Sequence, residues 1–267
     1  MFCVLTAYLD ESYNNRTFCV GGWLASVPEW NTIEKQWIQR VEYERRKSIE
    51  KGFPPISRYH ASDCSSLKGE FDVSKGWDVT RQIKFSKRLL AILAKHKPLG
   101  IVVGGSVDDY LRHLTSDTKE KQWQAGLYYF SIMVVMDQIA QIMKAYFPRE
   151  KVTIYYDRGK FSSMADRAFR SLKDDPRNSD ISKYFVTMGP MGWEDCVPLQ
   201  PADLLAFEGL KRVDGSLNGK TAIRKSLQAL LGGKVDLSIG HFSDKTFQAL
   251  IADKAEELDA LMGEDFA

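Results

Sequence analysis

The chain has 267 residues, of which 44% are hydrophobic and 27% are charged, and its formal net charge is only +2. This balance is typical of a globular protein with a sizeable core, and it excludes an argument for nucleic-acid binding from bulk charge alone. We expect one domain over residues 1–267. No membrane span is predicted, because no apolar run approaches the roughly 18 residues that one requires. The four scattered cysteines and the absence of a signal-peptide pattern favour reduced thiols in a cytoplasmic protein.

The first predicted elements form a hairpin. The stretch Val4–Ser12 is predicted to be a strand of a covered sheet, because its apolar run has both faces mostly apolar and stops on Asp10, Glu11 and Ser12. An Asn-rich turn follows, and Phe18–Leu24 is predicted to return antiparallel to the first strand. Asp10 and Glu11 would then lie at the end of a buried strand. The alternative is that Asp10 only closes an Asx-type turn.

The middle of the chain alternates between helices and one strong strand. Apolar spacings of three and four predict the long helices, and Pro or Gly clusters end them. The region Ile56–Lys75, which contains Tyr59-His60-Ala61, is predicted to be irregular. The most apolar helix is expected to pack between other elements rather than on the surface. The predicted elements are helices Pro28–Lys51, Trp77–Lys97, Asp108–Leu114 and Gln122–Phe147, and the strand Leu99–Gly105.

The second half begins with another strand that ends on an acid, because Val152–Tyr156 leads directly into Asp157. A further strand, Lys183–Thr187, is followed by a Gly/Pro-rich loop and then by a helix from Gln200, with Asp203 in its first turn. Residues 200–267 are predicted to form a helical layer. The other predicted helices are Ser163–Asp174, Thr221–Leu231 and Asp244–Leu261, with a loop containing His241 before the last.

Three acids therefore occupy comparable places. Residues at the carboxyl ends of neighbouring parallel strands converge on one crevice, so Asp10 and Asp157 would be close, with Asp203 beside them. Such oxygen ligands suit Mg²⁺ or Mn²⁺, and two ions about 4 Å apart can activate a water on a phosphodiester. Each acid also has a structural alternative: Asp157 begins an Asp-x-Gly turn, and Asp203 suits a helix N-terminus.

With these motifs in this order, the chain resembles the domain of unknown function 3800 family. The matching pieces are Tyr8–Ser12, Val20–Gly22, Tyr59–Ala61, Tyr155–Asp157 and Gln200–Glu208. The resemblance implies an α/β, ribonuclease-H-like fold with a mixed five-stranded sheet, in which later strands run parallel to the first. It also implies that Asp10, Asp157 and Asp203 form an acidic metal site.

The chain departs from the family pattern at two places. Lys160 stands where a Glu often follows the strand-four acid, and Glu194-Asp195 stand where a Ser usually precedes the Gln200 motif. These two acids are either a replacement carboxylate or ordinary loop residues.

Further candidate residues lie near the three acids in sequence. Glu11 is a candidate for catalysis only if the backbone turns there, since a continuing strand would point it to the opposite face. His60 is a candidate acid–base or phosphate contact, or else a solvated or capping histidine. Arg58, Arg158 and Lys160 are candidate contacts to a nucleic-acid backbone. Glu208 is expected to pair with Lys211 or Arg212.

The leading hypothesis is a divalent-metal-dependent phosphodiester hydrolase acting on nucleic acid, RNA or DNA. The alternative is a non-catalytic module that binds nucleic acid or protein, as a partner in a defence or mobile-element system. A glycosidase using two carboxylates is a third hypothesis, and it requires an aromatic-lined sugar cleft. The many aromatic residues are compatible with a homodimer.

Overall fold

The computed structural model describes residues 4–113, 119–242 and 245–248. These residues form a mixed six-stranded sheet in the order β5-β4-β1-β2-β3-β6. The pairs β1–β2 and β2–β3 are antiparallel, whereas β1–β4, β4–β5 and β3–β6 are parallel. The strands are β1 Val4–Tyr13, β2 Thr17–Ser26, β3 Leu99–Ser106, β4 Lys151–Asp157, β5 Phe185–Met191 and β6 Leu237–Phe242.

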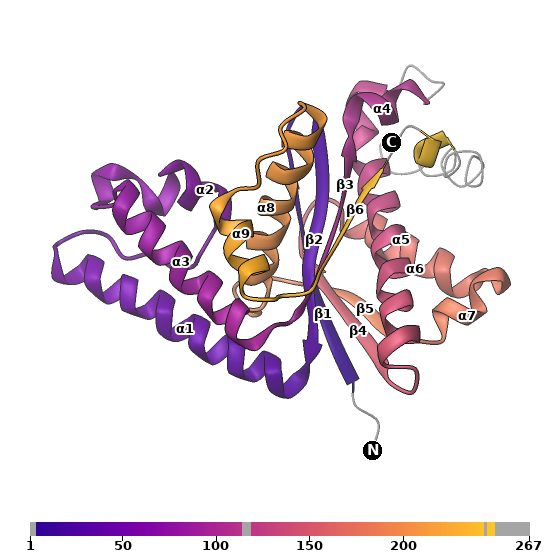
Figure 1. Ribbon diagram of the computed structural model, residues 1–267, viewed down its shortest axis with the longest axis horizontal. Helices are drawn as coiled ribbons and strands as arrows, with labels where there is room; N and C mark the ends of the chain where they lie inside the picture. Colours follow the sequence, from indigo (N-terminus) through magenta and orange to yellow (C-terminus); the bar gives the residue numbers. More distant parts are fainter. Residues whose placement is uncertain (1–3, 114–118, 243–244, 249–267) are drawn as a thin grey trace.

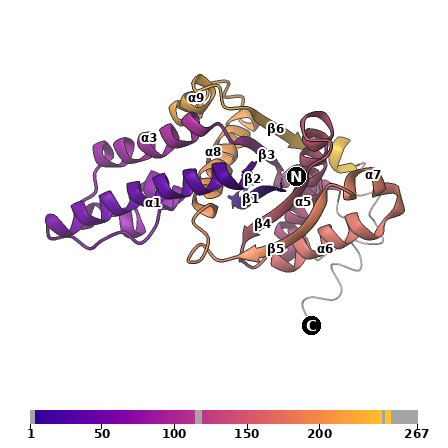
Figure 2. The ribbon, with the colours of Figure 1, turned by 90° about the horizontal axis from the view of Figure 1, so that it is seen from below.

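Helices cover both faces of the sheet, which is seen nearly edge-on in Figure 1. One layer holds α1, α2, α3, α8 and α9, and the other holds α5, α6 and α7. Seen from below, α1 and α3 lie side by side and extend away from the sheet (Figure 2). The helices are α1 Val27–Glu50, α2 Ala61–Ser66, α3 Val79–His96, α4 Val107–Arg112, α5 Lys119–Tyr146, α6 Ser162–Asp174, α7 Ser179–Ser182, α8 Leu199–Leu217 and α9 Lys225–Gly232. The short 3-10 helices are Gly69–Phe71, Val73–Lys75 and Pro176–Asn178.

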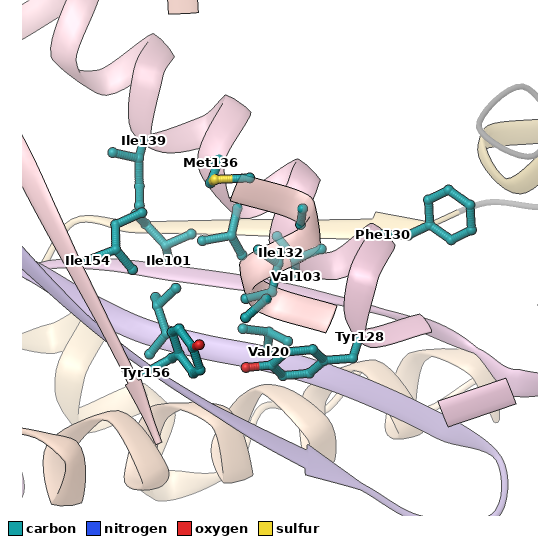
Figure 3. Packing of buried hydrophobic residues seen from close by; sticks show 14 of the residues in the cluster. Val20, Ile101, Val103, Tyr128, Phe130, Ile132, Met136, Ile139, Ile154 and Tyr156 are labelled. Carbon is teal, nitrogen blue, oxygen red and sulfur yellow. The ribbon is translucent and has the colours of Figure 1, made fainter. Parts of the chain in front are cut away.

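The helix α5 packs its apolar side chains on one face of the sheet. Figure 3 shows Tyr128, Ile132 and Met136 of α5 above Val20 and Ile154 of the strands. By length and composition alone, its segment Trp123–Tyr146 is long and apolar enough to cross a membrane, contrary to the sequence prediction. The segment is mostly buried in the fold, as is typical of a core helix.

The predicted α/β class and the N-terminal hairpin are confirmed, but the sheet has six strands rather than five. The sixth strand, β6, contains His241 and lies in the region predicted to be helix and loop. It is a partly exposed strand that pairs only with β3, so its own sequence carries a weak signal. The region Ile56–Lys75, predicted to be irregular, contains α2 and two 3-10 helices.

Other predictions fall partly or wholly outside the described residues. Most of the predicted helix Asp244–Leu261 lies there, as do Leu114, the predicted end of the helix from Asp108, and Cys3. The other three cysteines are buried and free of disulfides, as predicted. Glu208 does not form its predicted ion pair, because its Oε2 lies 3.4 Å from Nε of Arg224 on the segment preceding α9.

Candidate acidic site

A cavity of about 190 Å³ opens where β1, β4, the start of α8 and the segment before α2 meet. We call it the acidic cavity. Four of its lining side chains are carboxylates, brought together from three elements that are far apart in the sequence. The lining residues are Asp10, Glu11, Arg58, Tyr59, His60, Asp157, Trp193, Leu199, Gln200 and Asp203.

The register of β1 and β4 places Asp10 beside Asp157. The last paired residues of the two parallel strands are Leu9 and Tyr156, so each aspartate is the next residue of its strand. Two residues earlier, Tyr8 and Tyr155 stack with ring centroids 5.6 Å apart on the same face. The predicted convergence of these two strands therefore occurs, on the face that α8 covers.

Close packing of α8 on the sheet brings in Asp203. A Cβ on Gly21 would lie 2.7 Å from the backbone N and Cα of Ala206, so only glycine allows this approach. Gly21 is also the β2 partner of Asp10. Asp203 is the fifth residue of α8, not a first-turn residue as predicted, because the helix begins at Leu199. Its predicted alternative role, as a charge on the helix N-terminus, is therefore wrong.

Two acceptors on α8 hold the segment before α2 against the cavity. The side-chain Oε1 of Gln200 accepts a hydrogen bond from the Tyr59 N–H at 2.9 Å. One helical turn later, Oδ2 of Asp203 accepts from the Ala61 N–H at 2.7 Å. His60 lies between these two anchored residues and lines the cavity. Its Nδ1 lies 3.0 Å from Oδ2 of Asp63, and it makes no capping hydrogen bond to α2.

The strand β1 does not stop at Asp10, contrary to the prediction, because pairing with β2 continues through Tyr13. Alternation along the strand assigns Asp10 to the α8 face and Glu11 to the α5 face. Glu11 nevertheless lines the acidic cavity, since the paired part of β4 ends beside it. No turn is needed to bring Glu11 into the site.

The carboxylates raise one another's pKa. Burial raises the pKa of Asp10 well above its ordinary value, and the charges of Asp203, Glu11 and Asp157 raise it further. Burial and then Asp157 raise the pKa of Glu11 to about 7, against a lowering effect of Lys160. Burial raises the pKa of Asp203 to about 6, although His60 opposes this. Negative charge is therefore costly in this cavity, and a bound cation would relieve the cost.

The donor chemistry of the cavity suits a hard divalent cation. Within the described residues, Oδ1 of Asp157 is buried with no hydrogen-bond partner, and the Asp10 carboxylate accepts one hydrogen bond, from the adjacent Glu11 N–H at 2.7 Å. Carboxylate oxygens of this kind are ligands for Mg²⁺ or Mn²⁺. Across the described ranges, however, no three His, Cys, Asp or Glu side chains are already grouped as a metal-holding set.

The predicted cationic residues separate into two groups. Arg58 lines the acidic cavity, and its guanidinium carbon lies 4.1 Å from the ring centroid of Trp193. Arg158 and Lys160 are exposed beside the end of β4 and do not line the cavity. Lys160 lies over the rings of Tyr13 and Phe161 instead.

Glu194 and Asp195 are exposed loop residues that do not line the cavity. Burial raises the pKa of Asp157, and the charge of Glu194 raises it further. The loop that carries them brings Trp193 to the cavity, a residue that the sequence analysis did not single out. No signal in the sequence distinguishes this indole from the buried tryptophans. The role of Gln200 was also missed: its buried Oε1 accepts hydrogen bonds from the indole N–H of Trp37 and from the Tyr59 N–H.

A scan against protein-family models gives no match, and no curated protein is detectably similar in sequence. The function of this chain is therefore inferred from the residues of the acidic cavity.

Proposed function

We propose that the protein is a divalent-metal-dependent phosphodiester hydrolase acting on nucleic acid, built on a ribonuclease-H-like core. The observation that carries this proposal is the meeting of Asp10, Glu11, Asp157 and Asp203 in one cavity, where burial and mutual repulsion raise their pKa values. A bound cation would offset the repulsion among these carboxylates, and it would in turn bind a substrate phosphate.

The arrangement of the sheet supports the ribonuclease-H-like assignment. The antiparallel strands β1, β2 and β3 are joined by β4 and β5, which run parallel to β1. This matches the sheet that the resemblance to the domain of unknown function 3800 implies, with β6 added beside β3. Membership of that family is part of the proposal.

In the proposed reaction, Asp10, Asp157 and Asp203 would hold Mg²⁺ or Mn²⁺. The ion would lower the pKa of the attacking water and neutralise negative charge on the phosphate. Glu11, with a pKa of about 7, is suited to accept or return a proton near neutral pH. His60 is a second candidate for proton transfer, and Arg58 would contact a phosphate oxygen inside the cavity. Arg158 and Lys160 would contact the backbone outside it. By analogy with the fold, the products carry a 5′-phosphate and a 3′-hydroxyl.

The first test is calorimetric titration of Mn²⁺ into the wild-type protein, Asp10→Asn and Asp157→Asn, together with cleavage assays on RNA and DNA. Both substitutions should remove Mn²⁺ binding and cleavage without unfolding the protein. Asp108→Asn, at an exposed position of α4, is the matched control and should behave as wild type. Full cleavage by Asp10→Asn would refute the assignment.

A second candidate is the non-catalytic binding module, possessing the fold but no hydrolysis. The observation that favours it is that Lys160 stands where the family pattern often has a Glu after the acid of β4. Binding of nucleic acid or protein with an affinity that neither Mn²⁺ nor Asp10→Asn changes would support this candidate.

A further inference from the structure

A second cavity of about 350 Å³ adjoins the acidic cavity. The two share Arg58, His60 and Trp193 as lining residues. We call the second one the Trp193 cavity. Its wall is completed by the segment before α2 and by the two 3-10 helices between α2 and α3. The lining residues are Ser57, Arg58, His60, Asp63, Gly69, Glu70, Phe71, Lys75 and Trp193.

The shared wall combines an aromatic ring with a planar cation. The guanidinium of Arg58 lies over the indole of Trp193 at 4.1 Å, which is a cation–π contact. Trp193 is only partly buried, and its ring is accessible from both cavities. Indole rings and guanidinium planes are the two side-chain surfaces on which unpaired bases stack.

The acids of the Trp193 cavity already have partners. Glu70 accepts hydrogen bonds from the Ser57 N–H at 2.7 Å and from the Ser57 hydroxyl at 2.8 Å. Asp63 is the 3.0 Å neighbour of His60. Lys75 and Arg58 also line this cavity, and their positive charges are suited to a phosphate. The two carboxylates of this cavity therefore repel an anion less than two unpartnered carboxylates would.

We infer that the Trp193 cavity binds the nucleotide next to the phosphate held in the acidic cavity, with its base stacked on the Trp193–Arg58 pair. A base can reach this cavity only if it is unpaired and out of a duplex stack, and a single strand offers such a base without the cost of opening a duplex, so we expect single-stranded nucleic acid to be the preferred substrate. The inference rests on the proposed function for the position of the phosphate, but the stacking contact does not depend on hydrolysis.

The test uses fluorescence anisotropy of labelled single-stranded and duplex oligonucleotides, without divalent metal so that no cleavage occurs. Wild type should bind the single strand more tightly than the duplex. Trp193→Ala should weaken single-strand binding roughly five- to a hundredfold, the range for loss of one stacked base. Trp193→Phe keeps an aromatic face and should retain most of the affinity. Lys87→Ala, at an exposed lysine of α3 outside both cavities, is the control for general loss of positive charge.

Oligonucleotides with one abasic position, placed in turn along the strand, identify the contact. At one position, removal of the base should weaken wild-type binding as much as Trp193→Ala does, and should weaken Trp193→Ala no further. If Trp193→Ala binds as wild type does, or if every abasic position acts equally on both proteins, the inference is overturned.

The two proposals fail in different ways. Single-strand binding that depends on Trp193, without Mn²⁺-dependent cleavage, would refute the hydrolase and keep the stacking contact. Cleavage abolished by Asp10→Asn but unaffected by Trp193→Ala, with equal affinity for duplex and single strand, would keep the hydrolase and refute the stacking contact.

Discussion

Glu11 offers a quantitative test of the electrostatics of the site. Its folded environment raises its pKa from 4.5 to about 7, chiefly through burial and then through Asp157. The folded protein therefore binds more protons than the unfolded chain between these two values, and the free energy of unfolding falls as pH rises through this interval. At about 1.4 kcal/mol for each pKa unit, the charged carboxylate destabilises the fold by about 3 kcal/mol at pH 8 and about 1 kcal/mol at pH 5.

The substitution Glu11→Gln removes this charge and keeps the shape of the side chain. In urea denaturation without divalent metal, the variant should be more stable than wild type at pH 8. About 3 kcal/mol is the upper limit, because the amide also loses hydration. The advantage should shrink at pH 5. Glu50→Gln, at an exposed glutamate of α1, should show no such pH-dependent gain. A Glu11→Gln variant less stable than wild type at pH 8, or a gain independent of pH, would refute the reasoning.

Three further predictions concern the support of the cavity. Gly21→Ala places a Cβ 2.7 Å from the α8 backbone and should cost about 1–3 kcal/mol in thermal or urea unfolding, whereas Gly189→Ala, with open space around it, should be near neutral. Gln200→Ala leaves the Tyr59 N–H and the indole N–H of Trp37 without an acceptor, so the free energy of unfolding should fall by at least about 2 kcal/mol in the same measurement. An unchanged stability would contradict this. Mn²⁺ affinity measured by calorimetry should rise from about pH 5.5 to 7.5, as Asp203 and Glu11 lose protons, and a flat profile would argue against them as ligands or neighbours of the ion.

The sequence was sufficient to predict the parts of the fold that local patterns determine. The hairpin, the buried strand before Asp157 and the long helices all follow from apolar periodicity and from Pro and Gly positions. The meeting of Asp10 and Asp157 was also predicted, because parallel pairing of their two strands places both acids at the same edge of the sheet, and Asp203 was expected beside them.

What was missed depends on contacts between distant segments. The strand β1 continues past Asp10 only because β2 supplies partners for it, and β6 exists only beside β3. Trp193 reaches the cavity on an irregular loop, and the path of such a loop cannot be predicted from apolar periodicity. Gln200 became informative only once its two donors were located in space.

The site is built in two mechanically different ways. Asp10 and Glu11 are consecutive residues of one strand, so covalent geometry holds their Cα atoms about 3.8 Å apart whatever the surrounding helices do. The spacing of Asp157 and Asp203 from this pair is instead set by strand register and by the seating of α8 on Gly21. A ligand that draws the carboxylates together would therefore move β4 and α8 towards a fixed reference on β1.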